Sequence, residues 1–150
     1  MNIIFITLLI IHTYTDLRYM LLYDYVTLAL AICGLVRAVY MQQFMAALQG
    51  AGVLLVVMLL LYFVSRGGMG EGDVKLAPAL GLWLHTEQGL LCLLLAFVSG
   101  ALVGGVMLLL GKGRRSAIPF GPFLCAGALT AYFCGARIIW WYWHFMVNLA

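Results

Sequence analysis

Charged residues are scarce in this sequence. Asp, Glu, Lys and Arg make up 9% of its 150 residues, whereas a soluble domain usually carries about a quarter. Five acids and eight basic residues cannot cover the surface of a globule of this size. Because 66% of the residues are hydrophobic, the composition excludes an ordinary soluble protein and predicts that lipid surrounds most of the surface.

Several reactive motifs are missing as well. The sequence has no CxxC pair, and no HExxH sequence of the kind that binds zinc in metalloproteases. Its cysteines all lie in apolar stretches, which favours small buried hydrophobes over a metal or disulfide site. They are Cys33, Cys92, Cys125 and Cys134. The basic residues separate apolar runs instead of forming a patch, so no nucleic-acid partner is predicted.

The apolar runs predict an all-α integral membrane protein, a bundle of about six transmembrane helices in a single domain over residues 1–150. The spans are expected at about 1–15, 24–41, 48–65, 73–86, 88–110 and 118–140. The first and fourth are shorter than the ~20 residues that cross a bilayer. Each has an acid at one end, which indicates polar groups near one face of the membrane.

The distribution of Lys and Arg predicts the orientation. Six of the eight lie in the first, third and fifth connections, namely Arg18, Arg66, Lys75, Lys112, Arg114 and Arg115. By the positive-inside rule these connections face the cytoplasm, so the chain is expected in the cytoplasmic (inner) membrane with both termini outside. The run at 140–144 predicts an aromatic belt at the outer interface. The three histidines stand near span ends, where interfacial positions are expected; they are His12, His85 and His144.

The acids carry the only credible chemistry. Four of the five fall on the predicted cytoplasmic side: Asp16, Asp24, Glu71 and Asp73. Two carboxylates brought together in a low-dielectric setting cannot both ionise easily, so the pair holds a shared proton. One member can then deprotonate a water while the other protonates a scissile carbonyl oxygen. This pattern predicts aspartyl proteolysis without a metal or an organic cofactor.

The most informative segment is 67–75, which reads Gly-Gly-Met-Gly-Glu-Gly-Asp-Val-Lys. Its four glycines allow unusual backbone angles and let a substrate backbone come close to Asp73. The alternative interpretation is a flexible cytoplasmic loop kept wet by its Asp and Lys. A phosphate-binding loop is disfavoured because no Gly-Lys-Ser/Thr follows and an acidic loop repels phosphate.

Three stretches resemble one family. Gly70-Glu71-Gly72-Asp73 fits the GxGD motif of intramembrane-type aspartyl proteases, and with Val74-Lys75 it resembles the GxGDxK form of type IV prepilin peptidases and their archaeal preflagellin relatives. Residues 13–18 (Thr-Tyr-Thr-Asp-Leu-Arg) resemble the family's first catalytic segment, in which an Asp ends the first helix. Residues 118–123 (Ile-Pro-Phe-Gly-Pro-Phe) resemble its Pro-Phe-Gly-Pro segment near the start of the last helix.

The resemblance implies a role for each matched residue. Asp16 and Asp73 would be the catalytic pair, Gly70 and Gly72 would shape the backbone around Asp73, and Lys75 would support the site electrostatically. Asp24 is the alternative first acid, since it stands where the family commonly has Asn. Asp16 is preferred because its helix-end position and its Leu-Arg neighbours match.

The resemblance also implies a substrate and partners. A prepilin peptidase cleaves the short basic leader from prepilin or pseudopilin precursors at the cytoplasmic face of the lipid bilayer. The larger family members carry an extra region with paired cysteine motifs, associated with N-methylation. The sequence lacks that pattern, so it resembles a short form for which the protease is expected and the methyltransferase is unsupported.

Three alternatives remain at this stage. A small transporter or channel would use the same carboxylates as proton or cation ligands, although it would more often place them near the membrane midplane. A non-catalytic assembly protein would tolerate Asp→Asn at both positions. A presenilin-like protease shares GxGD, but the Lys75 extension and the short chain speak against it.

Overall fold

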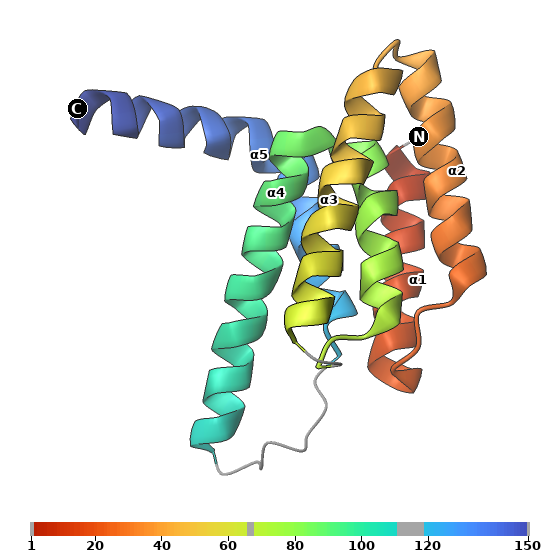
Figure 1. The fold of residues 1–150 in the computed structure, drawn as a ribbon, viewed down its shortest axis with the longest axis vertical. Helices are drawn as coiled ribbons and strands as arrows, with labels where there is room; N and C mark the ends of the chain where they lie inside the picture. Colours follow the sequence, from red (N-terminus) through yellow and green to blue (C-terminus); the bar gives the residue numbers. More distant parts are fainter. Residues whose placement is uncertain (1, 66–67, 111–118, 150) are drawn as a thin grey trace.

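The structure is a computed structural model that describes residues 2–65, 68–110 and 119–149. In these residues the chain forms five helices and no strand, arranged as a bundle (Figure 1). The helices are α1 (Asn2–Tyr19), α2 (Asp24–Tyr40), α3 (Phe44–Val64), α4 (Glu71–Leu109) and α5 (Gly121–Leu149). The all-helical prediction is therefore confirmed.

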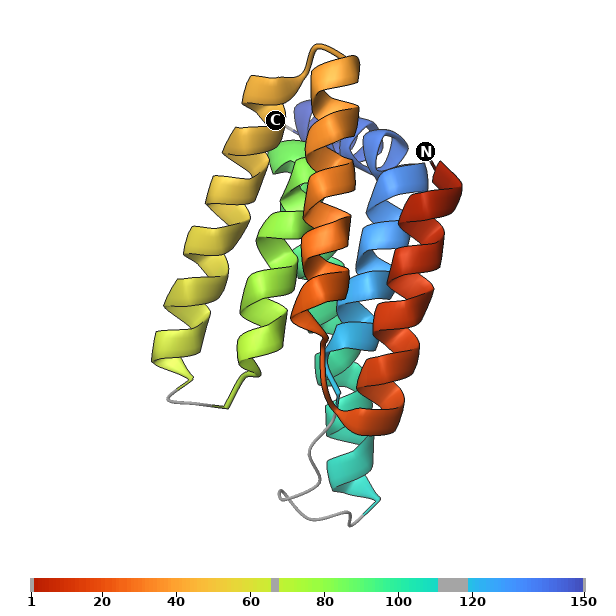
Figure 2. The same ribbon diagram turned by 90° about the vertical axis from the view of Figure 1, so that its right-hand side faces the viewer.

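Helix α4 is two arms joined without a loop. His85 leaves helical geometry, with φ 59° and ψ −166°. Residues 71–84 run up the bundle and residues 86–109 run back down beside it (Figures 1 and 2). A positive φ is costly for a residue other than glycine, so the reversal is made at a strained position. The spans predicted at 73–86 and 88–110 correspond to these two arms.

The other helices follow the predicted spans with shifted ends. Helix α3 begins earlier than predicted, at Phe44, and α5 continues through the aromatic run to Leu149. Among the described residues, three helices are long and apolar enough to cross a membrane: Phe44–Val64, Glu71–Leu109 and the part of α5 from Gly121 to Asn148. Large apolar side chains are exposed along them, up to 89% at Leu109, as expected for surfaces that contact lipid.

The first arm of α4 lies at the centre of the bundle. Its Trp83 is 1% exposed, stacks on Phe5 of α1 with ring centroids 4.7 Å apart, and donates its indole N–H to the Leu30 carbonyl of α2 at 2.9 Å. The Arg37 guanidinium lies 5.7 Å from the Trp83 ring centroid, a cation–π distance. These contacts fix the arm that carries Asp73 against both N-terminal helices.

Helices α3 and α4 cross closely because both have glycine at the contact. A Cβ added at Gly50 would lie 2.6 Å from the His85 backbone, and one added at Gly81 would lie 2.6 Å from the Gly50 backbone. Small residues at such crossings let helix backbones approach, as membrane bundles require. The crossing holds the first arm of α4 at a defined height relative to α3.

Gly81→Ala is expected to destabilise the protein by about 1–3 kcal/mol, because the added methyl overlaps backbone atoms that must move apart. Gly52→Ala is the matched control, since a Cβ there meets nothing within 4 Å. The free energy of unfolding in mixed detergent micelles measures both. Equal stability of the two variants would contradict the close crossing.

The connections alternate between the two ends of the bundle. The C-terminus of α1, both ends of the 65–70 connection and the N-terminus of α5 lie at one end, whereas the chain termini and the α2–α3 turn lie at the other (Figures 1 and 2). Among the predicted cytoplasmic cations, Arg18 and Lys75 belong to the first end. The remaining four, and Ile118, lie outside the described residues: Arg66, Lys112, Arg114 and Arg115.

Candidate active site

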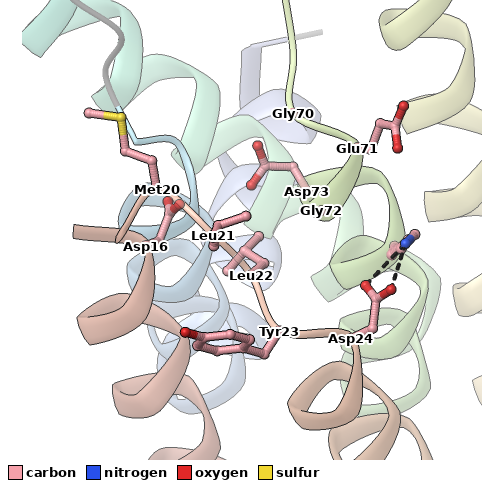
Figure 3. Close-up of a pocket in the computed structure, with 11 residues that line it drawn as sticks. Asp16, Met20, Leu21, Leu22, Tyr23, Asp24, Gly70, Glu71, Gly72 and Asp73 are labelled. Atoms are coloured by element: carbon pink, nitrogen blue, oxygen red, sulfur yellow. Dashed lines mark hydrogen bonds and ion pairs between the residues drawn. The ribbon is translucent and has the colours of Figure 1, made fainter. Parts of the chain in front are cut away.

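Two cavities open at the end of the bundle where α1 ends and α4 begins. The first has a volume of about 480 Å³, and the second a volume of about 370 Å³. Four residues line both cavities, so these residues mark their junction: Asp16, Met20, Gly70 and Asp73. The two acids predicted to form a pair thus come together from segments far apart in the sequence (Figure 3).

Asp16 lies in the last turn of α1 and is 6% exposed. The N–H of Gly121 donates a hydrogen bond to its Oδ2 at 2.8 Å. Gly121 is the first residue of α5, whose N-terminal end carries partial positive charge. The hydrogen bond from Gly121 stabilises negative charge on the Asp16 carboxyl.

Asp73 lies in the first turn of α4 and is also 6% exposed. Its Oδ1 is buried and has no hydrogen-bond partner among the described residues. A buried carboxyl oxygen without a partner is costly to stability. Such a group is therefore a strong candidate for one that acts on a ligand.

The described glycines of this segment matter because they lack a side chain, not because they adopt unusual backbone angles. Gly70 has φ −69° and ψ 137°, and neither Gly68 nor Gly72 has a positive φ. A Cβ at Gly70 would lie 3.2 Å from Oδ2 of Asp73, and one at Gly72 would lie 2.9 Å from Cβ of Leu22. The two glycines leave room for the carboxyl and for the 20–23 connection that forms the cavity wall. Gly67 lies outside the described residues.

Asp24 and Lys75 form a separate pair at the edge of the first cavity. The Lys75 Nζ lies 2.8 Å from Oδ2 of Asp24, and both side chains are mostly exposed. Asp24 therefore differs from Asp16 in burial, in its partner and in its position (Figure 3). The ammonium of Lys75, predicted to support the site, binds Asp24 and is not hydrogen-bonded to Asp16 or Asp73.

His12 was expected near the membrane interface, and the structure places its side chain inside the bundle. The residue is fully buried in α1, one turn before Asp16. Its Nδ1 lies 2.9 Å from the Leu8 carbonyl oxygen, and its Nε2 lies 3.0 Å from the Thr27 hydroxyl of α2. The imidazole thus fixes the rotation of α1, and with it the direction of Asp16.

Sequence reasoning did not assign a site role to the 119–121 segment. Pro119 and Phe120 line the second cavity, and Gly121 holds Asp16. The Pro-Phe-Gly-Pro motif could have pointed to this segment, because it matched the family and had been given no role. Met20, which follows α1 with a positive φ of 52°, had no signal of this kind.

These features define the class of the protein. It is a helical membrane protein in which two buried aspartates line the same cavities. Within the described part of the chain, no group of three or more His, Cys, Asp or Glu side chains is arranged to hold a metal ion. The ionisable side chains of the described cavity walls include the carboxyls of Asp16, Asp24, Glu71 and Asp73 and the ammonium of Lys75.

The chain belongs to the type IV leader peptidase family, whose model matches residues 3–105. It is 40% identical over 145 residues to the prepilin leader peptidase/N-methyltransferase of Legionella pneumophila, which covers 91% of this chain and 50% of that protein. The protein of the same name from Bacillus subtilis (strain 168) is 30% identical over 145 residues, or 93% of this chain and 58% of the relative. The chain spans about half the length of these relatives. No solved structure matches it.

Proposed function

We propose that this chain is a membrane aspartyl endopeptidase that removes the short basic leader from prepilin-like precursors. The observation that carries the proposal is the pairing of Asp16 and Asp73, both 6% exposed, at the junction of two cavities. Membership of the type IV leader peptidase family supports the same reaction. The proposal covers the peptidase step alone, because two carboxyls supply no methyl-transfer chemistry.

The hydrogen bonds of the two acids support different roles for them in the first step. The Gly121 N–H stabilises negative charge on Asp16, whereas Oδ1 of Asp73 has no donor among the described residues. The shared proton therefore resides on Asp73. Asp16 takes a proton from water as the water oxygen attacks the scissile carbonyl carbon, and Asp73 gives its proton to the carbonyl oxygen.

The second step returns both carboxyls to their starting states. The tetrahedral diol collapses as one hydroxyl proton passes to Asp73. The C–N bond breaks, and the proton held by Asp16 goes to the departing amine. Binding of the substrate's apolar segment against the bundle would hold the scissile bond at the two acids and convert binding into proximity.

The proposed orientation places this site at the cytoplasmic face of the inner membrane. Arg18 and Lys75 lie at the site end, in agreement with the positive-inside rule. The two antiparallel arms of α4 would count as two crossings, which gives six in a single membrane-embedded domain. The transporter alternative is less well supported, because the acids lie at helix ends and not at mid-bundle (Figure 1).

The test is cleavage of a purified precursor with a basic leader by the protein in liposomes. Wild type is expected to release the leader, and Asp16→Asn and Asp73→Asn are not. Glu87→Gln is the control acid, since Glu87 lies beside the α4 reversal at the opposite end. Cleavage that persists in both Asp variants, or no cleavage by wild type, would overturn the proposal.

Asp24→Asn is expected to keep cleavage within about fivefold of wild type, because an exposed ion pair is worth only about 0–1 kcal/mol. The same holds for the double variant Asp24→Asn/Lys75→Gln, which removes both charges of the pair. Rates of leader release measure both. Loss of cleavage in Asp24→Asn, with activity kept in Asp16→Asn, would redraw the catalytic pair around Asp24 and Asp73.

A further inference from the structure

The two cavities that meet at the aspartates have different walls. The described lining of the first carries four carboxyls and one ammonium, from Asp16, Asp24, Glu71, Asp73 and Lys75. Apart from the shared acids, the described lining of the second carries no charge; its own contribution is Gly68, Met69, Pro119 and Phe120. One side of the junction, drawn in Figure 3, therefore favours a cationic segment, and the other favours an apolar one.

The charges of the first cavity do not cancel. Lys75 is already bound to Asp24 at 2.8 Å, and Asp16 and Asp73 are buried at the junction. Glu71 is exposed on the cavity wall, and its hydrogen bond among the described residues comes from the neutral Tyr62 hydroxyl at 3.4 Å. Glu71 is thus the acid that a bound chain could reach without breaking the ion pair.

The position of Asp73 indicates where a bound substrate chain would lie. The buried Oδ1 of Asp73 has no partner among the described residues, and Asp73 belongs to both cavities. A peptide whose carbonyl group approaches the Asp73 carboxyl lies at the junction of the cavities, with room for the chain in the first cavity on one side and in the second on the other. The direction of the bound chain is then decided by charge.

We infer that the first cavity binds the residues before the scissile bond, and that Glu71 is a specificity-determining residue for positive charge in that segment. The inference rests on the proposed function, because it takes the cleaved bond to lie between a polar leader and an apolar segment. The second cavity, with Met69 on its wall, then receives the apolar residues that follow the bond. Glu71 stands between Gly70 and Gly72 of the GxGD motif, so in this chain that position would set the preference for charge in the leader.

The test uses two precursors that differ only in the leader, one with Lys and Arg and one with Gln at the same positions. Glu71→Gln is expected to raise KM for the cationic leader about threefold to tenfold, with kcat kept, because it removes binding common to ground state and transition state. The same variant is expected to leave KM and kcat for the precursor with the neutral leader unchanged. Glu71→Lys is expected to reverse the preference, so that a precursor with Glu in the leader is cleaved better than the cationic one.

The controls separate this inference from the proposed function. Glu87→Gln and Glu87→Lys make the same charge changes at the opposite end of the bundle and are expected to leave the ratio between leaders unchanged. Equal effects of Glu71→Gln on both leaders would overturn the charge-reading role, while cleavage of both by wild type would still support the peptidase. Failure of wild type to cleave either precursor would instead count against the proposed function.

Discussion

Asp16→Asn, Asp73→Asn and the double variant are expected to lose leader cleavage to the same extent, by about a thousandfold or more. In the proposed mechanism the two carboxyls share one proton and act in the same step, so neither can complete the reaction alone. Residues that act as a unit are strongly non-additive in this way. Single-turnover rates in liposomes, with enzyme in excess over precursor, measure all three.

Stability measurements make this result specific to catalysis. Oδ1 of Asp73 has no hydrogen-bond partner among the described residues, so Asn at this position breaks no hydrogen bond between that atom and those residues. The free energy of unfolding of Asp73→Asn is expected to stay within about 1 kcal/mol of wild type. A double variant whose loss equals the product of the two single losses would show that the carboxyls act independently, and would contradict the shared proton.

Gly121→Ala is expected to slow cleavage by about a hundredfold although it changes no reactive group. A Cβ at this position would lie 2.6 Å from Oδ2 of Asp16, so the carboxylate must move away from the N–H that holds it at 2.8 Å. A displacement of about 1 Å in a catalytic group is enough for a loss of this size. The expected change is in kcat, with KM for the precursor kept.

Gly105→Ala is the matched control for Gly121→Ala. It makes the same substitution in the second arm of α4, where a Cβ meets nothing within 4 Å, and wild-type kinetics are expected. Full activity of Gly121→Ala would mean that Asp16 does not need the α5 N–H. In that event the assignment of Asp16 as the base would lose its support.

The helical class and the positions of most helices could be predicted from the sequence because lipid imposes long apolar runs. The break between the predicted fourth and fifth spans was visible in the polar residues around Glu87. The geometry of this break could not be predicted. The chain reverses at a single strained residue, His85 (φ 59°), and no particular amino-acid composition marks such a reversal. The end of α5 was predicted too early because an interfacial aromatic run can be helical or not.

The candidate site was predictable to the extent that it depends on charge. Acids are so rare in this chain that Asp16 and Asp73 could be selected, and the structure places both at one junction of cavities. Their catalytic role stays a prediction. The contact of Gly121 with Asp16 could not be predicted, because a backbone N–H leaves no mark in a sequence and this one acts across 105 positions. The burial of His12 depends on the rotation of α1, which only packing reveals.

The shortness of the first arm of α4 has a consequence for water. The arm spans residues 71–84, which is about 21 Å of helix, against a hydrocarbon thickness of ~30 Å. With its far end at the outer surface, as in the proposed orientation, Asp73 would sit below the level of the lipid headgroups. Hydrolysis at that depth would require water to reach Asp73 from the cytoplasm, and the two cavities beside Asp73 are the route that the proposed function assigns to it. A substrate would then not need to bring its scissile bond out of the membrane into bulk water. It would need to bring the bond only to the point that water reaches beside Asp73.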